Sequence, residues 1–101
     1  MAHRPEFLKD ISQAREFFEQ AFRAGHADSA AYLGAFYEYG IEYEMNIPRA
    51  YAYYDFAARH GSQEGESMRQ RLSKNISPEV ADEARSILQE LNETTNGVMI
   101  Y

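Results

Sequence analysis

The sequence predicts an all-α fold, a two-layer α/α solenoid of about five helices. The first observation behind this prediction is a sixteen-residue segment that occurs twice, 36 positions apart, at 10–25 and 46–61. A fixed period of about 20 to 50 residues is typical of stacked repeats, in which each unit buries its apolar face against a neighbour. The second is that apolar residues recur at helical spacing, and no alternating pattern is long enough to build a sheet.

The two copies of the segment agree at the positions that set helix packing. Glycine, alanine and isoleucine recur, and two aromatic pairs and one acidic pair keep their chemical type. The identities are Ile11/Ile47, Ala14/Ala50, Ala21/Ala57, Arg23/Arg59 and Gly25/Gly61, and the conservative pairs are Phe17/Tyr53, Phe18/Tyr54 and Glu19/Asp55. Helices one and three are therefore predicted to be equivalent elements of one stack, joined through small residues with aromatics filling the spaces between them.

The first half of the chain predicts two helices. Residues 10–24 carry apolar side chains on one wide face, and Gly25 follows where a left-handed C-cap is favoured. Residues 27–39 form the second helix. Gly34 inside it costs about 1 kcal/mol relative to alanine, which predicts that another helix presses close against it. Residues 40–45 form a loop.

The second half predicts three more helices. The third begins near Pro48, ends at Gly61 and is apolar almost all round, so it should lie between neighbours. The fourth spans about 62–74 and is the most polar. Ser77, Pro78 and Glu79 start the fifth, which runs to about Asn92. Residues 94–97 are predicted to turn before a tail at 98–101.

Composition and charge limit the function classes. A chain of 101 residues has room for one domain. No cysteine, no signal-peptide h-region and no stretch near 18 apolar residues is present, which predicts a cytoplasmic protein and no membrane partner. The net charge of −6, with Arg69, Arg71 and Lys74 as the only local basic cluster, argues against nucleic acid. A basic protein surface suits this charge better.

The segment at 25–40 resembles the first helix of a Sel-one-like repeat, a relative of the tetratricopeptide repeat. The Leu-Gly-x-x-Tyr-x-x-Gly signature of that family is present as Leu33, Gly34, Tyr37 and Gly40. The second-helix signature is also present, as Arg49, Ala50, Tyr53, Tyr54, Ala57, Ala58 and Gly61. The first copy matches more loosely, and residues 69–84 resemble the closing helix pair of such arrays.

The resemblance implies a division of the chain and shows three departures. It implies a partial repeat at 10–25, a full repeat at 26–61 and a C-terminal capping helix pair at 62–93. Glu42 replaces the usual second loop glycine, Tyr43 the loop valine and Asn46 an aspartate, so loop 40–47 should differ in shape. It also implies a non-enzymatic adaptor, scaffold or regulatory role, chiefly in bacteria, with a protein partner on the concave face formed by the first helices of successive units.

No motif in the sequence predicts catalysis, a metal site or a cofactor. His26 and His60 follow helix ends, His3 lies in the terminus, and none has a second ligand at metal-site spacing. The acidic pairs Glu16/Glu19 and Asp82/Glu83 are expected on solvent-facing surfaces. Cysteine-rich relatives have been linked to binding or hydrolysing β-lactams, but this chain lacks the paired cysteines of that branch.

Tyrosines that the repeat does not require are the candidate contacts, because tyrosine is enriched at protein interfaces. Ordinary half-buried packing remains the alternative for these side chains. The candidate partner-binding residues are Tyr32, Ala35, Glu38, Tyr39, Tyr43 and Tyr51.

A second candidate interface lies at the N-terminal helix, which matches the second helix of a unit whose first helix is missing. Its flank at Phe18 and Phe22 should be covered either by residues 3–9 or by another chain. The protein is thus expected to be a monomer or a homodimer. Two other functions stay open: an immunity or antitoxin protein that caps a basic toxin, and a helical hydrolase.

Overall fold

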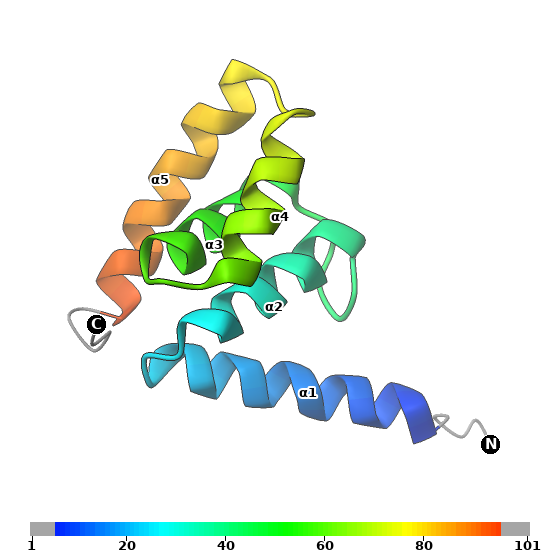
Figure 1. The fold of residues 1–101 in the computed structure, drawn as a ribbon. Coiled ribbons are helices and arrows are strands. Elements are labelled where there is room, and N and C mark those ends of the chain that lie inside the picture. Colours follow the sequence, from blue (N-terminus) through cyan, green and yellow to red (C-terminus); the bar gives the residue numbers. More distant parts are fainter. Residues whose placement is uncertain (1–5, 96–101) are drawn as a thin grey trace.

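The computed structural model describes residues 6–95, and over this range the chain forms helices joined by short loops, with no strand (Figure 1). The all-α prediction and the expected number of helices are confirmed. The five helices are α1 (Glu6–Arg23), α2 (Ala27–Tyr39), α3 (Ile47–Arg59), α4 (Gln63–Ser73) and α5 (Pro78–Thr95).

Two helix ends differ from the prediction. α1 begins at Glu6, so Phe7 and Leu8 continue the helix and do not fold back over it. α5 runs through Thr94 and Thr95, where a turn was predicted. The hydroxyls of these threonines donate hydrogen bonds to the carbonyls of Glu90 and Leu91, at 2.9 and 3.2 Å, which accommodates them in the last turn. The predicted tail at 98–101 lies outside the described residues.

α3 is the central helix. It packs against α2, α4 and α5. α1 packs mainly on α2 and makes a smaller contact with α5. Figure 1 shows α2 lying between α1 and α4. The α3 residues Ala50, Ala52, Tyr54, Phe56 and Ala57 are fully buried. The prediction that this helix lies between neighbours is confirmed.

The repeated segment ends in the same backbone structure in both copies. Gly25 and Gly61 adopt left-handed φ values of 102° and 94°. In each copy the residue after the glycine donates to the carbonyl of the repeated alanine: His26 N to Ala21 O at 2.9 Å, and Ser62 N to Ala57 O at 2.9 Å. This is the Schellman arrangement, which satisfies carbonyls at a helix end. The sequence repeat is therefore also a repeat of local structure.

Gly34 marks a close approach of α2 to α3, as its position in the middle of a helix predicted. A Cβ built on Gly34 would lie 2.7 Å from ring atoms of Tyr54 and 3.1 Å from the Ala50 carbonyl oxygen. α3 and α4 meet equally closely at Gly65, where a Cβ would lie 2.5 Å from the Cβ of Ala57. Only glycine fits at either contact without moving its neighbours.

The loop between α2 and α3 has a conformation that favours glycine, but Glu42 occupies it. Glu42 has a φ of 63°, in the left-handed region. Its carboxylate accepts a 2.8 Å hydrogen bond from Ser12 and lies 3.4 Å from Arg15, both on α1. Asn46 then caps α3 by accepting a 3.0 Å bond from the amide of Arg49. The loop therefore ties α1 to the start of α3.

Candidate functional site

Three of the predicted contact residues lie on one exposed strip of α2. Tyr32, Ala35 and Tyr39 are spaced three and four residues apart, which places them on one helix face. Tyr39 is 61% exposed and Tyr32 is 37% exposed, while Ala35 is half-buried between them. We call these three residues the tyrosine strip. The faces of α2 on either side of the strip pack against α1 and α4.

Glu38 was expected beside these tyrosines as a contact residue, but its side chain is buried. It is only 9% exposed and accepts three hydrogen bonds. Tyr54 on α3 donates to Oε1 at 2.7 Å, and Arg71 on α4 donates to both carboxylate oxygens, at 2.6 and 2.9 Å. Glu38 therefore positions Arg71 and is not itself available to a partner.

The surroundings of Glu38 favour its charged form. Burial alone raises the pKa of the carboxyl group, but the hydrogen bonds from Arg71 and Tyr54 outweigh burial and lower the pKa overall. The same contact raises the pKa of Tyr54, for which burial is the largest cause and the Glu38 carboxylate the next. At neutral pH Glu38 is thus a carboxylate held by a guanidinium and a neutral phenol.

α4 contributes charged side chains along one edge of the tyrosine strip. Arg71, held by Glu38, lies close enough to Tyr39 for the phenol to help raise the pKa of the guanidinium, although the Glu38 bond is the main cause. At the other end, the neighbouring Glu64 carboxylate raises the pKa of the Tyr32 hydroxyl. The strip therefore has a cation beside Tyr39 and a carboxylate beside Tyr32.

Tyr43 and Tyr51 do not join the tyrosine strip. Tyr43 is half-buried and stacks on Tyr37, with ring centroids 4.1 Å apart, and its hydroxyl donates to Glu19 on α1. Burial and this bond raise the pKa of Tyr43. Tyr51 is half-buried on α3 and packs against the hydrophobic core. Both tyrosines take the packing role that was the alternative for them.

The predicted N-terminal interface residues are also covered within the chain. Phe22 is buried and contacts the rings of Tyr53 and Phe56, at centroid distances of 5.4 and 5.2 Å. Phe18 is half-buried, 4.8 Å from the Tyr32 ring. Among the α1 aromatics whose side chains the structure describes, the exposed one is Phe17, which the sequence interpretation had placed in the core and which is 64% exposed. The signal that could have identified it is that Phe17 matches Tyr53, while α1 matches the second helix of a repeat unit whose first helix is not among the described residues.

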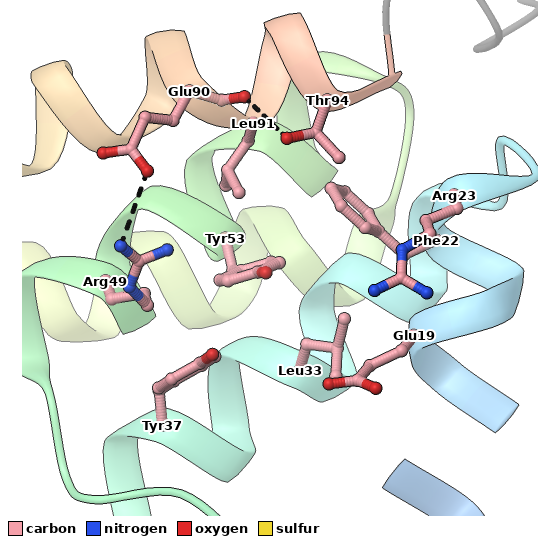
Figure 2. A pocket seen from close by; sticks show the side chains of 10 residues that line it. All are labelled: Glu19, Phe22, Arg23, Leu33, Tyr37, Arg49, Tyr53, Glu90, Leu91 and Thr94. Atoms are coloured by element: carbon pink, nitrogen blue, oxygen red, sulfur yellow. Dashed lines mark hydrogen bonds and ion pairs between the residues drawn. The ribbon is translucent and has the colours of Figure 1, made fainter. Parts of the chain in front are cut away.

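A pocket of about 250 Å³ opens between α1, α2, α3 and α5 (Figure 2). Its charged lining consists of two arginines and two glutamates, so the formal charges cancel, and Arg49 lies 3.6 Å from Glu90. Burial raises the pKa of Tyr53 to about 12 and that of Tyr37 in the same direction. Neutral phenols can donate hydrogen bonds but cannot act as bases at neutral pH. The lining residues are Glu19, Phe22, Arg23, Leu33, Tyr37, Arg49, Tyr53, Glu90, Leu91 and Thr94.

The histidines and acidic pairs form no ligand cluster in the part of the chain that the structure describes. Between residues 6 and 95, no group of three or more acidic, histidine or cysteine side chains is arranged to hold a metal ion. His60 packs on Phe56, with ring centroids 4.3 Å apart, and burial lowers its pKa. Glu19, expected to be solvated, instead binds Arg15 and Tyr43. No helix in the described range has the length and apolar character to span a bilayer.

Comparisons of the chain with protein-family models, with curated proteins and with solved structures find no match in any of the three.

Proposed function

We propose that the protein is a non-enzymatic interaction module that binds a partner protein through the tyrosine strip and the adjoining edge of α4. The observation that carries this proposal is the exposure of Tyr32 and Tyr39 on a helix whose other faces are packed. An exposed tyrosine can bury a large area in an interface while immobilising only two torsions. Two exposed tyrosines on one strip therefore indicate that the strip is a surface for contact with another protein.

The charged neighbours of the strip support the same function. Arg71 is fixed by two hydrogen bonds to Glu38, so little of its side-chain entropy remains to be lost on binding. Arginine and tyrosine are also the residue types that dominate binding energy at protein interfaces. The pair of Tyr39 and Arg71 is therefore the proposed energetic centre of the contact.

We further propose that the helices are arranged as a Sel-one-like, tetratricopeptide-type array. In this arrangement α2 and α4 form the concave layer and α1, α3 and α5 the other. The identical helix ends at Gly25 and Gly61 support it. So does the packing order, in which α3 contacts α2, α4 and α5 while α2 also contacts α4. The tyrosine strip then lies on the concave face.

An inhibitor of a basic toxin or effector is a second candidate, favoured by the acidic end of the strip. Asp28 and Glu64 line a second pocket together with Gly61 and Gln63, next to the Tyr32 hydroxyl. A chain with a net charge of −6 would attract a basic partner and would associate with it faster at low salt. This candidate uses the same strip and differs only in what the partner does.

The test is affinity capture from the native host with the wild-type chain, Tyr39→Ala and Arg85→Ala. Arg85 is a long, exposed side chain on α5, far from the strip in sequence, and serves as the matched control. We expect Tyr39→Ala to lower recovery of a specific partner by about tenfold or more, while Arg85→Ala retains it. Equal recovery with Tyr39→Ala contradicts the proposed surface. Turnover of a β-lactam that one pocket substitution abolishes would contradict the non-enzymatic assignment.

A further inference from the structure

Four residues of α1 correspond in the repeat to four buried residues of α3. We call Ala14, Phe17, Phe18 and Ala21 the open α1 strip. Their counterparts on α3, Ala50, Tyr53, Tyr54 and Ala57, are all buried, with Tyr53 the most exposed at 8%. None of the four α1 residues is buried, and Phe17 is the most exposed. The same pattern of residues is thus covered on one helix and open on the other.

One side of the open α1 strip is already covered in the way the repeat requires. Phe18 packs against Tyr32 and Phe36 of α2, with ring centroids 4.8 and 6.0 Å apart. Its counterpart Tyr54 packs in a cluster with Leu72 and Met68 of α4, which lie 36 positions after Phe36 and Tyr32. α2 therefore holds the same place on α1 that α4 holds on α3.

The other side of the α3 residues is covered by α2 itself. Gly34 presses against the Tyr54 ring and the Ala50 carbonyl, and Tyr37 stacks on Tyr53 with centroids 5.5 Å apart. Within residues 6–95, α1 packs against α2 and α5 and reaches α3 through Phe22, which is not one of the four strip residues, so no helix holds the corresponding place on α1. The missing neighbour is a helix with a small residue opposite Phe18 and an apolar or aromatic residue opposite Phe17.

Charge indicates what kind of helix fits. Asp10 lies on α1 one turn before Ala14, and Asp28 and Glu64 lie near Tyr32, the α2 residue that packs on Phe18. All three are exposed, and no basic side chain in the described range forms an ion pair with Asp10, Asp28 or Glu64. A second copy of this chain would bring together two chains that each carry a net charge of −6. Like charges disfavour the pairing of two copies, whereas a basic helix complements these acidic side chains.

We infer that the open α1 strip is a docking site for a basic amphipathic helix of the partner protein, in the place that α2 holds on α3. The inference rests on the proposed interaction function but concerns a different helix: the open α1 strip adjoins the tyrosine strip only where Phe18 contacts Tyr32. In helix-in-groove binding of this kind, the contact is made by apolar side chains that lie one and two turns apart on the bound helix. Phe17 is the anchor that the chain supplies.

The probe is a fluorescent peptide with the sequence of Ala27–Tyr39 carrying Asp28→Lys and Glu38→Lys, which makes it basic and keeps Gly34. Binding is followed by fluorescence anisotropy with the full chain. We expect saturable binding that weakens by about tenfold or more with Phe17→Ala. Met45→Ala is the matched control, because Met45 is equally exposed at 64% but lies in the loop after α2, and we expect it to change affinity by less than about twofold.

Two further variants test the chemistry of the site. A peptide with Gly34→Leu should lose binding, because the larger side chain meets Phe18. Asp10→Asn in the full chain should weaken binding at low salt and reduce its salt dependence. Tyr39→Ala should leave peptide binding unchanged, so a failure of this site and a failure of the tyrosine strip give different results.

The inference is overturned if the basic peptide shows no saturation up to on the order of 1 mM, or if the Gly34→Leu peptide binds equally well. A stable dimer in light scattering that Phe17→Glu dissociates would assign the strip to a second copy instead. Peptide binding only after removal of residues 96–101 would assign it to the chain's own tail. Either result rejects a partner helix as the occupant.

Discussion

The hydroxyl of Tyr54 on α3 donates a 2.7 Å hydrogen bond to the Glu38 carboxylate on α2, and both side chains are buried. Arg71 on α4 binds the same carboxylate through two nitrogens. One carboxylate thus joins three helices beneath the tyrosine strip. Because a buried charge is costly when it loses a partner, each member of this network should be sensitive to substitution.

Tyr54→Phe should lower the free energy of unfolding by about 1 to 3 kcal/mol, because Glu38 loses one of its three hydrogen bonds in a buried place. Urea denaturation followed by circular dichroism measures the change. The matched control is Tyr39→Phe, which removes the hydroxyl of an exposed tyrosine and should change stability by less than about 0.5 kcal/mol. Equal effects of the two substitutions would contradict the role of the network.

The Glu38 carboxylate should also make stability depend on pH in acid. Its pKa is lowered in the folded chain relative to the ordinary value of 4.5, so the charged form stabilises the fold above that value. Stability should then fall as the pH drops below about 4.5 and approaches the folded-state pKa. The loss with pH should be smaller in Glu38→Gln, measured by urea midpoints between pH 3 and 6. His60 is present in both proteins, so its own titration cancels in the comparison; superimposable pH profiles would exclude Glu38 as the source.

Gly34→Ala should destabilise the protein although alanine favours helices. The new methyl group would lie 2.7 Å from the ring of Tyr54, which is fully buried and tied to Glu38. We expect a net loss of about 1 to 3 kcal/mol in unfolding free energy, since overpacking outweighs the gain in propensity. The reverse exchange on the neighbouring residue, Ala35→Gly, should cost about 1 kcal/mol from propensity alone. A more stable Gly34→Ala protein would mean that α2 and α3 are not in close contact.

Alkaline titration should separate the tyrosines into two groups. Burial raises the pKa of Tyr53 to about 12, and burial together with the hydrogen bonds to Glu19 and Glu38 raises the pKa values of Tyr43 and Tyr54. A raised pKa means that the neutral phenols stabilise the fold fully below about pH 10 and that this contribution is lost as the pH rises above it. Phenolate absorbance should therefore show a late group that titrates together with loss of the helical signal. A single transition near pH 10 with the fold intact would refute the buried placement.

The helices could be predicted from sequence because their signals are local. The start of α2 at Ala27 agrees with the predicted range, and the end of α3 before Gly61 and the proline at the start of α5 agree with the expected capping residues. Repeated glycines gave identical turns at Gly25 and Gly61, since only the backbone conformation matters there. Two helix ends were predicted wrongly: α1 begins at Glu6 and not at residue 10, and α5 continues through Thr94 and Thr95, whose hydroxyls bond to carbonyls of the preceding turn.

The candidate contacts were harder to predict, because burial depends on which helix lies opposite. Helical spacing placed Tyr32, Ala35 and Tyr39 on one face, and they share an exposed strip. The same spacing placed Glu38 next to them. Glu38 directly precedes Tyr39, however, so its side chain leaves α2 in a different direction and binds Tyr54 and Arg71. Phe17 and Phe22 exchanged their expected roles, since Phe22 contacts Tyr53 and Phe56 while Phe17 is 64% exposed.

By itself the sequence determined the number of helices, where most of them begin and end, and which two are copies of one another. Those properties follow from backbone preferences and from the spacing of side chains along a single helix. The tertiary structure alone decided that one carboxylate binds α2, α3 and α4 together and that α1 keeps an aromatic side chain open. Such contacts join residues far apart in the chain, and the free energy of burying or exposing a side chain is set by its neighbours in space.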